Sequence, residues 1–258
     1  EAHCNLSHLY LATDKPELAL KHATRAIQLR PGFAEALSNL GLAQKELGDL
    51  GSAIKSLRAA VDAKENFTPA LANLAILLKA DGQLKEALAI YRQAMASAPN
   101  DPVPAYNASL ILLQLGEFEY GWQLYEERWN APNFESRPIN TTKPKWKGER
   151  TAQRLLIWPE QGVGDEVMFA SLFTQLQSVV QNILVITDRR LIPMFRRSFP
   201  TIQFISKEVG VQEGDFDIHL PIGSLPSIFC RKDTDFKNIT EAYLKPDIEL
   251  QINLREKL

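Results

Sequence analysis

Small and apolar residues recur at a fixed interval through the first half of the chain. Three sets have members 34 residues apart: Ala19, Ala53 and Ala87; Ala26, Ala60 and Ala94; and Leu6, Leu40 and Leu74. Between them, apolar positions follow helical spacing, first at Leu37, Leu40 and Leu47 and then at Ala53, Leu57 and Ala60. The pattern predicts antiparallel helix pairs, which must stack because one pair cannot bury its apolar stripe alone.

Turn residues separate the predicted helices. Gly48-Asp49, Asp81-Gly82 and Leu115-Gly116 lie between the two helices of a pair, and Pro31 and Pro99 end second helices. A 34-residue period with small residues at fixed helical positions resembles the tetratricopeptide repeat. The resemblance implies an α-solenoid of about four helix pairs over residues 1–130.

The fourth predicted pair departs from the pattern. Gly121 replaces the small alanine, and Trp122, Tyr125 and Trp129 make the second helix aromatic. We interpret this helix as the surface that docks the following domain.

One polar residue recurs on the first helix of every pair. Its copies are Asn5, Asn39, Asn73 and Asn107. A carboxamide donates and accepts hydrogen bonds, so a row of them can hold the backbone of an extended peptide. The superhelical arm of O-GlcNAc transferase is similar, and there the row holds the acceptor polypeptide. The alternative is that asparagine is merely a solvated residue at this repeat position.

A clamp for a C-terminal carboxylate is excluded by the neighbouring positions. Those positions lack the lysine or arginine that such a clamp requires: they are Cys4, His8, Ser38, Leu42, Ala72, Ile76, Tyr106 and Leu110. The sequence therefore predicts a protein or peptide partner without a carboxylate clamp.

Residues 131–153 are predicted to be an irregular linker, interrupted by Pro132, Pro138 and Pro144. Trp146 is a large apolar residue in this polar segment, and we expect it to be buried in the following domain. The cations of the linker are Lys143, Lys145, Lys147 and Arg150. They indicate either a solvated surface or a segment that steers an anionic donor.

Strands and helices alternate over residues 154–258, which predicts a parallel sheet with right-handed crossovers. The expected strands are 155–158, 183–187, 202–206 and 216–220, the expected helices 165–180 and 191–198, with a short helix from Glu249. The predicted fold class is thus α plus α/β, a helical solenoid followed by a Rossmann-like lobe.

The turn Glu160–Asp165 joins the first predicted strand to its helix. We expect Gly162 and Gly164 to allow a tight bend and Asp165 to cap the helix. Open α/β sheets bind ligands at such turns. A Walker phosphate loop is excluded because no Gly-Lys-Ser or Gly-Lys-Thr follows. Dinucleotide binding is a further possibility, because Asp188 lies at the end of the second predicted strand, where such folds place the acidic residue that binds ribose. The motif is incomplete, since Val167 occupies the position of the third glycine.

An ordered set of motifs follows the repeats, and together they give a resemblance that covers nearly the whole chain. It runs through Gly121-Trp122, Tyr125, Arg128-Trp129, Trp146-Lys147-Gly148, Glu160–Asp165 and Phe216–Pro221 to Ser224-Leu225-Pro226. The set resembles bacterial proteins that join tetratricopeptide repeats to a two-lobed GT-B glycosyltransferase. Residues 154–258 are similar to the N-terminal lobe of heptosyltransferases and more remotely to the O-GlcNAc transferase catalytic region.

The resemblance implies a glycosyltransferase that uses a nucleotide sugar as substrate, with no metal or other cofactor. It implies that Asp165 acts as general base toward an acceptor hydroxyl, with Glu160 as second candidate. Gln161, Gly162, Gly164 and His219 would contact acceptor or substrate, with His219 at the same carboxyl edge of the sheet as Asp165. The donor-binding lobe is absent, so residues 1–258 alone are expected to turn over little. Helix capping is the alternative role of Asp165.

The composition of the chain limits the kinds of partner and the cellular location that we expect. The net charge of −2 gives no basic footprint for nucleic acid or an anionic membrane. No apolar run is long enough to span a bilayer. Cys4 and Cys230 stand apart and outside metal-ligand spacing, which favours reduced thiols and a cytoplasmic location. The chain opens without methionine, as expected of a fragment. A non-catalytic interaction scaffold with a degenerate α/β cap is the alternative function.

Overall fold

The computed structural model describes residues 1–132, 134–160, 162–239 and 242–255. It divides into two compact units, Glu1–Leu115 and Gly116–Leu258. The division falls before the helix that we expected to close the repeat array at residue 130. The predicted boundaries of the solenoid, the linker and the lobe otherwise stay predictions.

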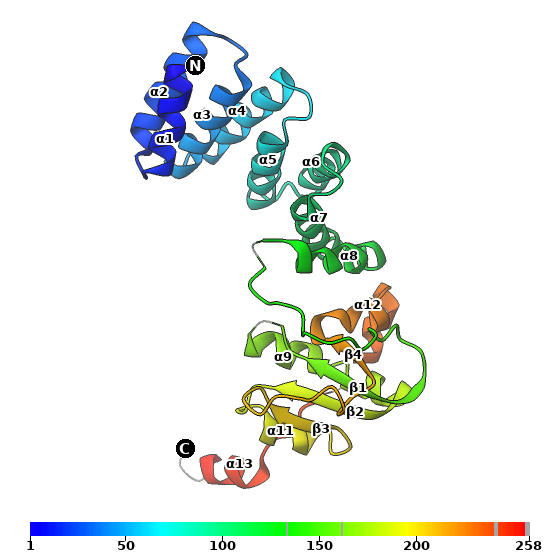
Figure 1. The fold of residues 1–258 in the computed structure, drawn as a ribbon. Coiled ribbons are helices and arrows are strands. Elements are labelled where there is room, and N and C mark those ends of the chain that lie inside the picture. The colour runs from blue at the N-terminus through cyan, green and yellow to red at the C-terminus, as the bar shows by residue number, and fades with distance from the viewer. Residues whose placement is uncertain (133, 161, 240–241, 256–258) are drawn as a thin grey trace. The chain divides into compact units, whose positions relative to one another are not determined.

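The first unit consists of helices arranged in antiparallel pairs (Figure 1). They are α1 (Ala2–Ala12), α2 (Pro16–Leu29), α3 (Ala34–Glu46), α4 (Leu50–Ala63), α5 (Thr68–Ala80), α6 (Leu84–Ser97) and α7 (Pro102–Gln114). The periodic alanines Ala19, Ala53 and Ala87 are fully buried between helices. The helix pairs predicted from the 34-residue period are therefore confirmed.

Short residues let the two helices of each pair approach closely. A Cβ atom on Gly41 would lie 2.8 Å from Cγ of Leu57 and 3.0 Å from the carbonyl oxygen of Ala53. The positions one period away, Ser7 and Ala75, are also fully buried. Ser7 donates its hydroxyl to the carbonyl of Ala19 at 2.8 Å, which links α1 to α2.

The turns within the pairs require a left-handed residue. Gly48 and Gly82 have φ angles of 82° and 79°, and Asp14 occupies the same repeat position with a φ of 54°. Glycine adopts this conformation without strain, and aspartate tolerates it better than most residues. The turns predicted at Gly48 and Gly82 are confirmed, and Asp14 adds a turn that was not predicted.

The second unit holds a parallel sheet of four strands in the order β3-β2-β1-β4. The strands are β1 (Thr151–Trp158), β2 (Val180–Thr187), β3 (Gln203–Ser206) and β4 (Ile218–Pro221). The helices are α8 (Phe118–Tyr125), α9 (Val163–Ala170), α10 (Phe173–Val179), α11 (Ile192–Ser198), α12 (Pro226–Phe229) and α13 (Ile248–Arg255), with 3₁₀ helices η1 (Glu126–Asn130), η2 (Ile222–Ser224) and η3 (Asp233–Ile239). The parallel sheet predicted from the alternating pattern is confirmed.

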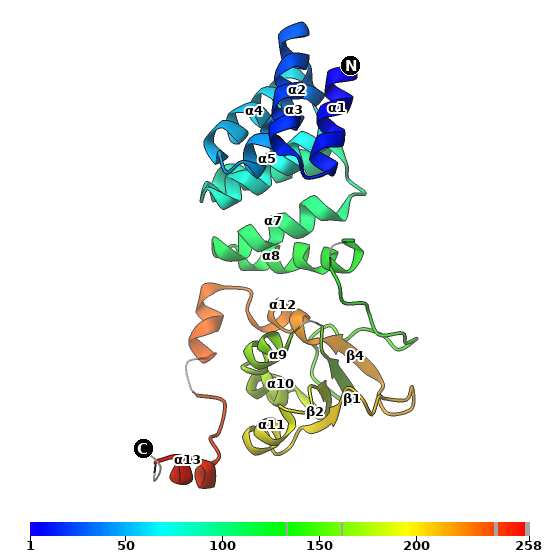
Figure 2. The same ribbon diagram turned by 90° about the vertical axis from the view of Figure 1, so that its left-hand side faces the viewer.

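One face of this sheet is covered by helices. Leu155 and Ile157 of β1 join a buried cluster with Phe173 of α10 and Phe195 of α11, and Figure 2 shows α9, α10 and α11 along the same side of the strands. On the other face, Trp129 and Ile139, which precede β1, pack against Leu156 and Trp158. The segment that we expected to be a linker therefore serves as a layer of the second unit.

Two expectations for this unit need correction. The helix predicted over residues 165–180 is two helices, because the backbone N–H groups of Ser171 and Leu172 donate to the carbonyls of Met168 and Phe169, three residues back rather than four, at 3.3 and 3.0 Å. The strand β2 then begins at Val180. Trp146 meets its prediction: only 2% of the residue is exposed, and its indole N–H donates to the carbonyl of Glu149 at 2.9 Å.

Candidate functional site

The carboxyl edge of the sheet is formed by the turn after β1 and the start of α9. Gly162 is the N-cap of α9, and Asp165 lies at the third helical position, where its N–H donates to the Gly162 carbonyl at 3.1 Å. Asp165 is therefore inside the first turn rather than at the capping position that we expected. Gln161, a predicted substrate contact, lies outside the described residues.

Asp165 is half-buried, and its side chain has no hydrogen-bond partner among the described residues. The first turn of a helix favours a negative charge, because its backbone N–H groups point away from the helix. Both carboxylate oxygens are therefore available to a ligand at the sheet edge.

The two glycines of the turn do not adopt a left-handed conformation. Gly162 has φ of −81° and ψ of 168°, and Gly164 is absent from the residues with positive φ. The bend between β1 and α9 therefore does not depend on a left-handed glycine at either position. Both glycines are exposed, and a Cβ atom on either would meet no atom within 4 Å. The space around both positions is therefore open.

Glu160 has a partner for each carboxylate oxygen. Oε2 accepts from Nε of Arg128 at 2.7 Å, while Oε1 accepts from Nη2 of Arg128 at 2.9 Å and from the backbone N–H of Gly223 at 2.8 Å. Its side chain is 4% exposed. A general base must be free to take a proton, so the geometry favours Asp165 over Glu160 for that role.

Arg128 is a fully buried guanidinium that the sequence reasoning did not single out as a site residue. Besides Glu160 it donates to Oε1 of Glu126 at 2.9 Å and to the hydroxyl of Ser224 at 2.9 Å. Its Cζ lies 4.4 Å from the ring centroid of Tyr125 and 4.5 Å from that of Trp129. The arginine thus joins η1, the end of β1 and η2.

Glu166 is a second buried charge that the sequence did not reveal. It is 1% exposed. Oε2 accepts from the Thr187 hydroxyl at 2.5 Å and from the N–H of Asp188 at 3.0 Å, and Nζ of Lys207 lies 2.6 Å from Oε1. The side chain therefore ties α9 to the ends of β2 and β3, and helical periodicity alone could only have placed it on the inward face.

Asp188 belongs to the same edge. Its carboxylate accepts hydrogen bonds from Nε and Nη2 of Arg190, both at 2.9 Å, and these hydrogen bonds lower the pKa of Asp188. A ribose ligand would have to compete with this pair. Dinucleotide binding remains a prediction, which titration with NADH would test.

His219 lies away from the carboxyl edge, which corrects the expected placement. It pairs in register with Leu156, whereas Pro221 is the residue of β4 that pairs with Trp158 at the strand end. Nδ1 of His219 accepts from the indole N–H of Trp158 at 3.1 Å. Its N–H and carbonyl bond to Pro144 and Trp146, so the segment before β1 lies along β4.

Burial lowers the pKa of the His219 imidazole, and the charge of Lys145 adds to this effect. His219 is the only histidine between residues 116 and 258. In the unfolded chain its pKa is about 6.5, so its contribution to stability is present above that pH and is lost as the pH falls. We expect the second unit to become less stable between about pH 7 and about pH 5.

Urea unfolding followed by tryptophan fluorescence measures this effect, since all the tryptophans lie in the second unit. The variant His219→Gln should show a flatter pH dependence over that range, and His8→Gln in the first unit should not differ from the parent. An equal pH dependence in His219→Gln would contradict the prediction.

The four asparagines of the repeat array occupy different environments. Asn39 is 9% exposed, and its Nδ2 donates to the carbonyl of Cys4 at 3.1 Å, so this amide joins α3 to α1. Asn5 is exposed, and Asn73 and Asn107 are half-buried, with no hydrogen-bond partner for these three amides among the described residues. Three members of the predicted row therefore keep amides available to a peptide.

Aliphatic side chains accompany the row. Leu42, Ile76 and Leu110 each follow an asparagine by three residues on α3, α5 and α7, and Ile76 is 47% exposed. Residues three apart on a helix share a face. The first helices of the pairs thus present adjoining polar and aliphatic side chains at the repeat spacing.

Metal-ligating side chains do not gather anywhere in the described part of the chain in groups of three or more. The Nδ1 atoms of His3 and His22 lie 2.8 Å apart.

Cys4 and Cys230 are buried free thiols, and burial raises the pKa of Cys230 to about 11. Every described helix is too short or too polar to cross a membrane.

Comparison with known proteins identifies the repeats. Residues 4–67 and residues 70–104 each match a family model of the tetratricopeptide repeat. The chain is 29% identical over 151 residues to Protein FlbA of Caulobacter vibrioides, a match that covers 52% of this chain and 25% of that protein. The chain thus spans about a quarter of the length of this curated relative. The 34-residue period is confirmed as a tetratricopeptide period.

Solved structures of other repeat proteins are also similar. MamA from Desulfovibrio magneticus RS-1 is 24% identical with a TM-score of 0.45, covering 49% of this chain and 71% of that one. PilF of Pseudomonas aeruginosa is 20% identical with a TM-score of 0.46, and the match covers 49% of this chain and 58% of PilF. The first repeat domain of Spaghetti (RPAP3), solved bound to the HSP90 peptide SRMEEVD, is 19% identical with a TM-score of 0.43. That match covers 44% of this chain and 93% of the RPAP3 domain.

Proposed function

Residues 4–67 and 70–104 are tetratricopeptide repeats, and we propose that they hold an extended segment of a partner protein on the first helices of the pairs. The observation that supports this function is the row of available amides at Asn5, Asn73 and Asn107, beside Ile76 and Leu110. α1 contacts α3 and α3 contacts α5, so α1, α3 and α5 form a continuous surface. Solenoids use such surfaces to bind elongated partners.

The chemistry of the row favours contacts to the partner's backbone. Each amide can donate to a peptide carbonyl and accept from a peptide N–H, irrespective of the partner's side chains. The aliphatic residues add apolar contact area worth about 25 cal/mol per Å² buried. The partner is therefore expected to be an extended, sequence-tolerant polypeptide.

Substitution of the row tests this function. A peptide selected by the chain from a displayed random library should bind Asn73→Ala/Asn107→Ala at least about tenfold more weakly, because each variant position loses at least one hydrogen bond of about 0.5–1.5 kcal/mol. Fluorescence anisotropy measures the affinity. N-methylation of the peptide backbone should weaken binding more than replacement of its side chains by alanine.

Asn100→Ala provides the control, since this exposed asparagine lies outside the row. Equal affinity of the row variant and the control variant would exclude the asparagines as the binding groups.

Glycosyl transfer by the parent protein is the second candidate function. Asp165 supports it, because this half-buried carboxylate without a described partner lies at the carboxyl edge of a parallel sheet. Open α/β sheets bind substrates at this edge. Asp165 would accept the proton of the acceptor hydroxyl, and the nucleotide sugar would be held mostly by a further lobe. Asp165→Asn in the parent protein tests this role.

A further inference from the structure

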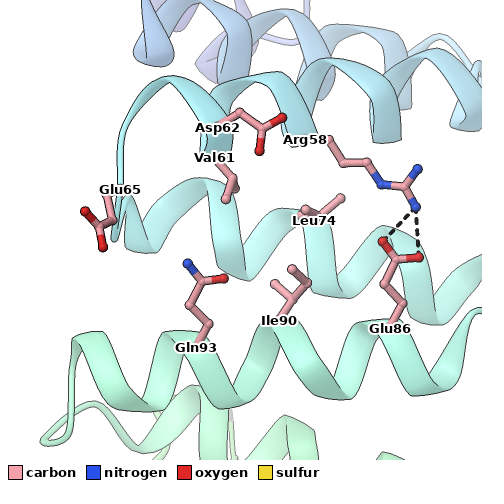
Figure 3. A pocket seen from close by; sticks show the side chains of 8 residues that line it. All are labelled: Arg58, Val61, Asp62, Glu65, Leu74, Glu86, Ile90 and Gln93. Carbon is pink, nitrogen blue, oxygen red and sulfur yellow. Dashed lines mark hydrogen bonds and ion pairs between the residues drawn. The ribbon is translucent and has the colours of Figure 1, made fainter.

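A pocket of 440 Å³ lies between α4 and α6, the second helices of two successive pairs, with α5 contributing to its floor. Its lining consists of Arg58, Val61, Asp62, Glu65, Leu74, Glu86, Ile90 and Gln93 (Figure 3). We call it the α4–α6 pocket. It is formed mainly by second helices, whereas the asparagine row lies on first helices.

The middle of the α4–α6 pocket is apolar and its ends are polar. Figure 3 shows Val61, Leu74 and Ile90 between the Arg58–Glu86 pair at one end and Glu65 with Gln93 at the other. Leu74 is 1% exposed, so it forms a packed floor rather than a mobile surface group. Such a lining suits a side chain that has an apolar stem and a polar head.

The charges of the pocket are unbalanced. Arg58 is already engaged, because its Nη2 lies 2.8 and 2.9 Å from the two carboxylate oxygens of Glu86. Asp62 and Glu65 are exposed and have no partner among the described residues. Lys64, the cation next to Glu65 in sequence, pairs with Glu35 at 2.7 Å. Two carboxylates are left for a ligand.

The neighbouring joint of the same array lacks these groups. The positions 34 residues earlier lie between α2 and α4 and are Thr24, Ile27, Gln28, Pro31, Leu40, Ser52, Ser56 and Ala59. The apolar floor is retained there in Ile27 and Leu40, but no charged residue is present. The repeat fold therefore accounts for the floor alone, and the carboxylates are particular to the α4–α6 pocket.

We propose that the α4–α6 pocket binds an arginine or lysine side chain from a partner protein, within a segment that has apolar residues beside the cation. The aliphatic stem would lie along Val61, Leu74 and Ile90, and its charged head would reach Asp62 or Glu65. An acidic partner segment is disfavoured because it would face these two carboxylates. This site is separate from the asparagine row, so one chain can hold two segments.

A labelled peptide tests the pocket. The probe is a fluorescein-labelled hexapeptide of alternating leucine and arginine, titrated into the whole chain and followed by anisotropy. Asp62→Asn/Glu65→Gln should bind it about fivefold more weakly, because two exposed carboxylates each contribute about 0.5 kcal/mol. The peptide with glutamate in place of arginine should not bind saturably.

The matched control is Asp14→Asn/Glu17→Gln, which removes the same two charges from exposed positions outside the pocket. Methyl NMR locates the peptide independently through the signals of Val61, Leu74 and Ile90. Shifts confined to these methyl groups, with affinity lost only in the pocket variant, would support the proposal. Absence of saturable binding, equal loss in both variants, or shifts at Leu42 and Ile76 instead would overturn it.

Discussion

Replacing Arg128 with methionine is expected to destabilise the second unit by about 3–5 kcal/mol. The guanidinium is fully buried and is held by Glu160, Glu126 and Ser224. Its removal leaves the carboxylate of Glu160, 4% exposed, without its ion pair inside the protein. A buried carboxylate without a cation costs far more than the apolar contacts that methionine can restore.

Tryptophan fluorescence during urea unfolding measures the loss, since all four tryptophans lie in Gly116–Leu258. Arg154→Met is the matched control: Arg154 pairs with Asp217 at 2.8 Å, but the arginine side chain is 48% exposed, so solvent screens the pair. Equal unfolding midpoints in the two variants would contradict the assigned role of the buried network.

The double variant Arg128→Met/Glu160→Gln separates charge from packing. Glutamine is neutral and still accepts from the N–H of Gly223, so part of the stability should return if the uncompensated carboxylate causes the loss. A double variant less stable than Arg128→Met would instead assign the loss to the contacts of Arg128 with Tyr125 and Trp129.

Replacing Asp165 with asparagine in the parent protein is expected to lower the rate of glycosyl transfer by about 10²–10⁴-fold, the usual contribution of a positioned general base. Asparagine has nearly the same shape but cannot take up the proton of an attacking hydroxyl. The folded state should change little, because a charge in the first helical turn contributes only about 0.3–1 kcal/mol. Release of nucleotide from a panel of nucleotide sugars measures the rate.

Asp215→Asn serves as the control for this experiment. Asp215 is an exposed carboxylate on the segment between β3 and β4, and its loss should leave transfer unchanged. If Asp165→Asn transfers sugar at the parental rate, then Asp165 only stabilises the start of α9. If the parent protein releases no nucleotide with any donor, the repeats alone define its function.

Regular patterns in the sequence were sufficient to predict the helix pairs and the parallel sheet. The 34-residue period required helix pairs, because Ala19 and Ala53 recur where helices must approach closely. Alternating apolar runs required a parallel sheet, since helical crossovers join strands of the same direction. These inferences depend on local spacing, which a sequence displays directly.

The positions of individual polar groups could not be predicted in the same way. Asn39 and Asn73 share one repeat position, yet only Asn39 is bonded to the preceding first helix. His219 was expected at the sheet edge, but the register of β4 places it beside Leu156. A change of two residues in the register of a strand leaves its side chains on the same face of the sheet but moves each one along the strand, away from the carboxyl edge. The spacing of residues in the sequence does not reveal this register.

The sequence by itself determined that helix pairs are followed by alternating strands and helices, because these patterns depend on residues close together in the chain. Only the tertiary structure decided which carboxylates are available: Glu160 is paired with Arg128, Glu166 with Lys207, and Asp165 with no described residue. The physical reason is that buried charges are satisfied by partners from distant segments. The distance from Arg128 to Glu160 is 32 residues in sequence and 2.7 Å in space.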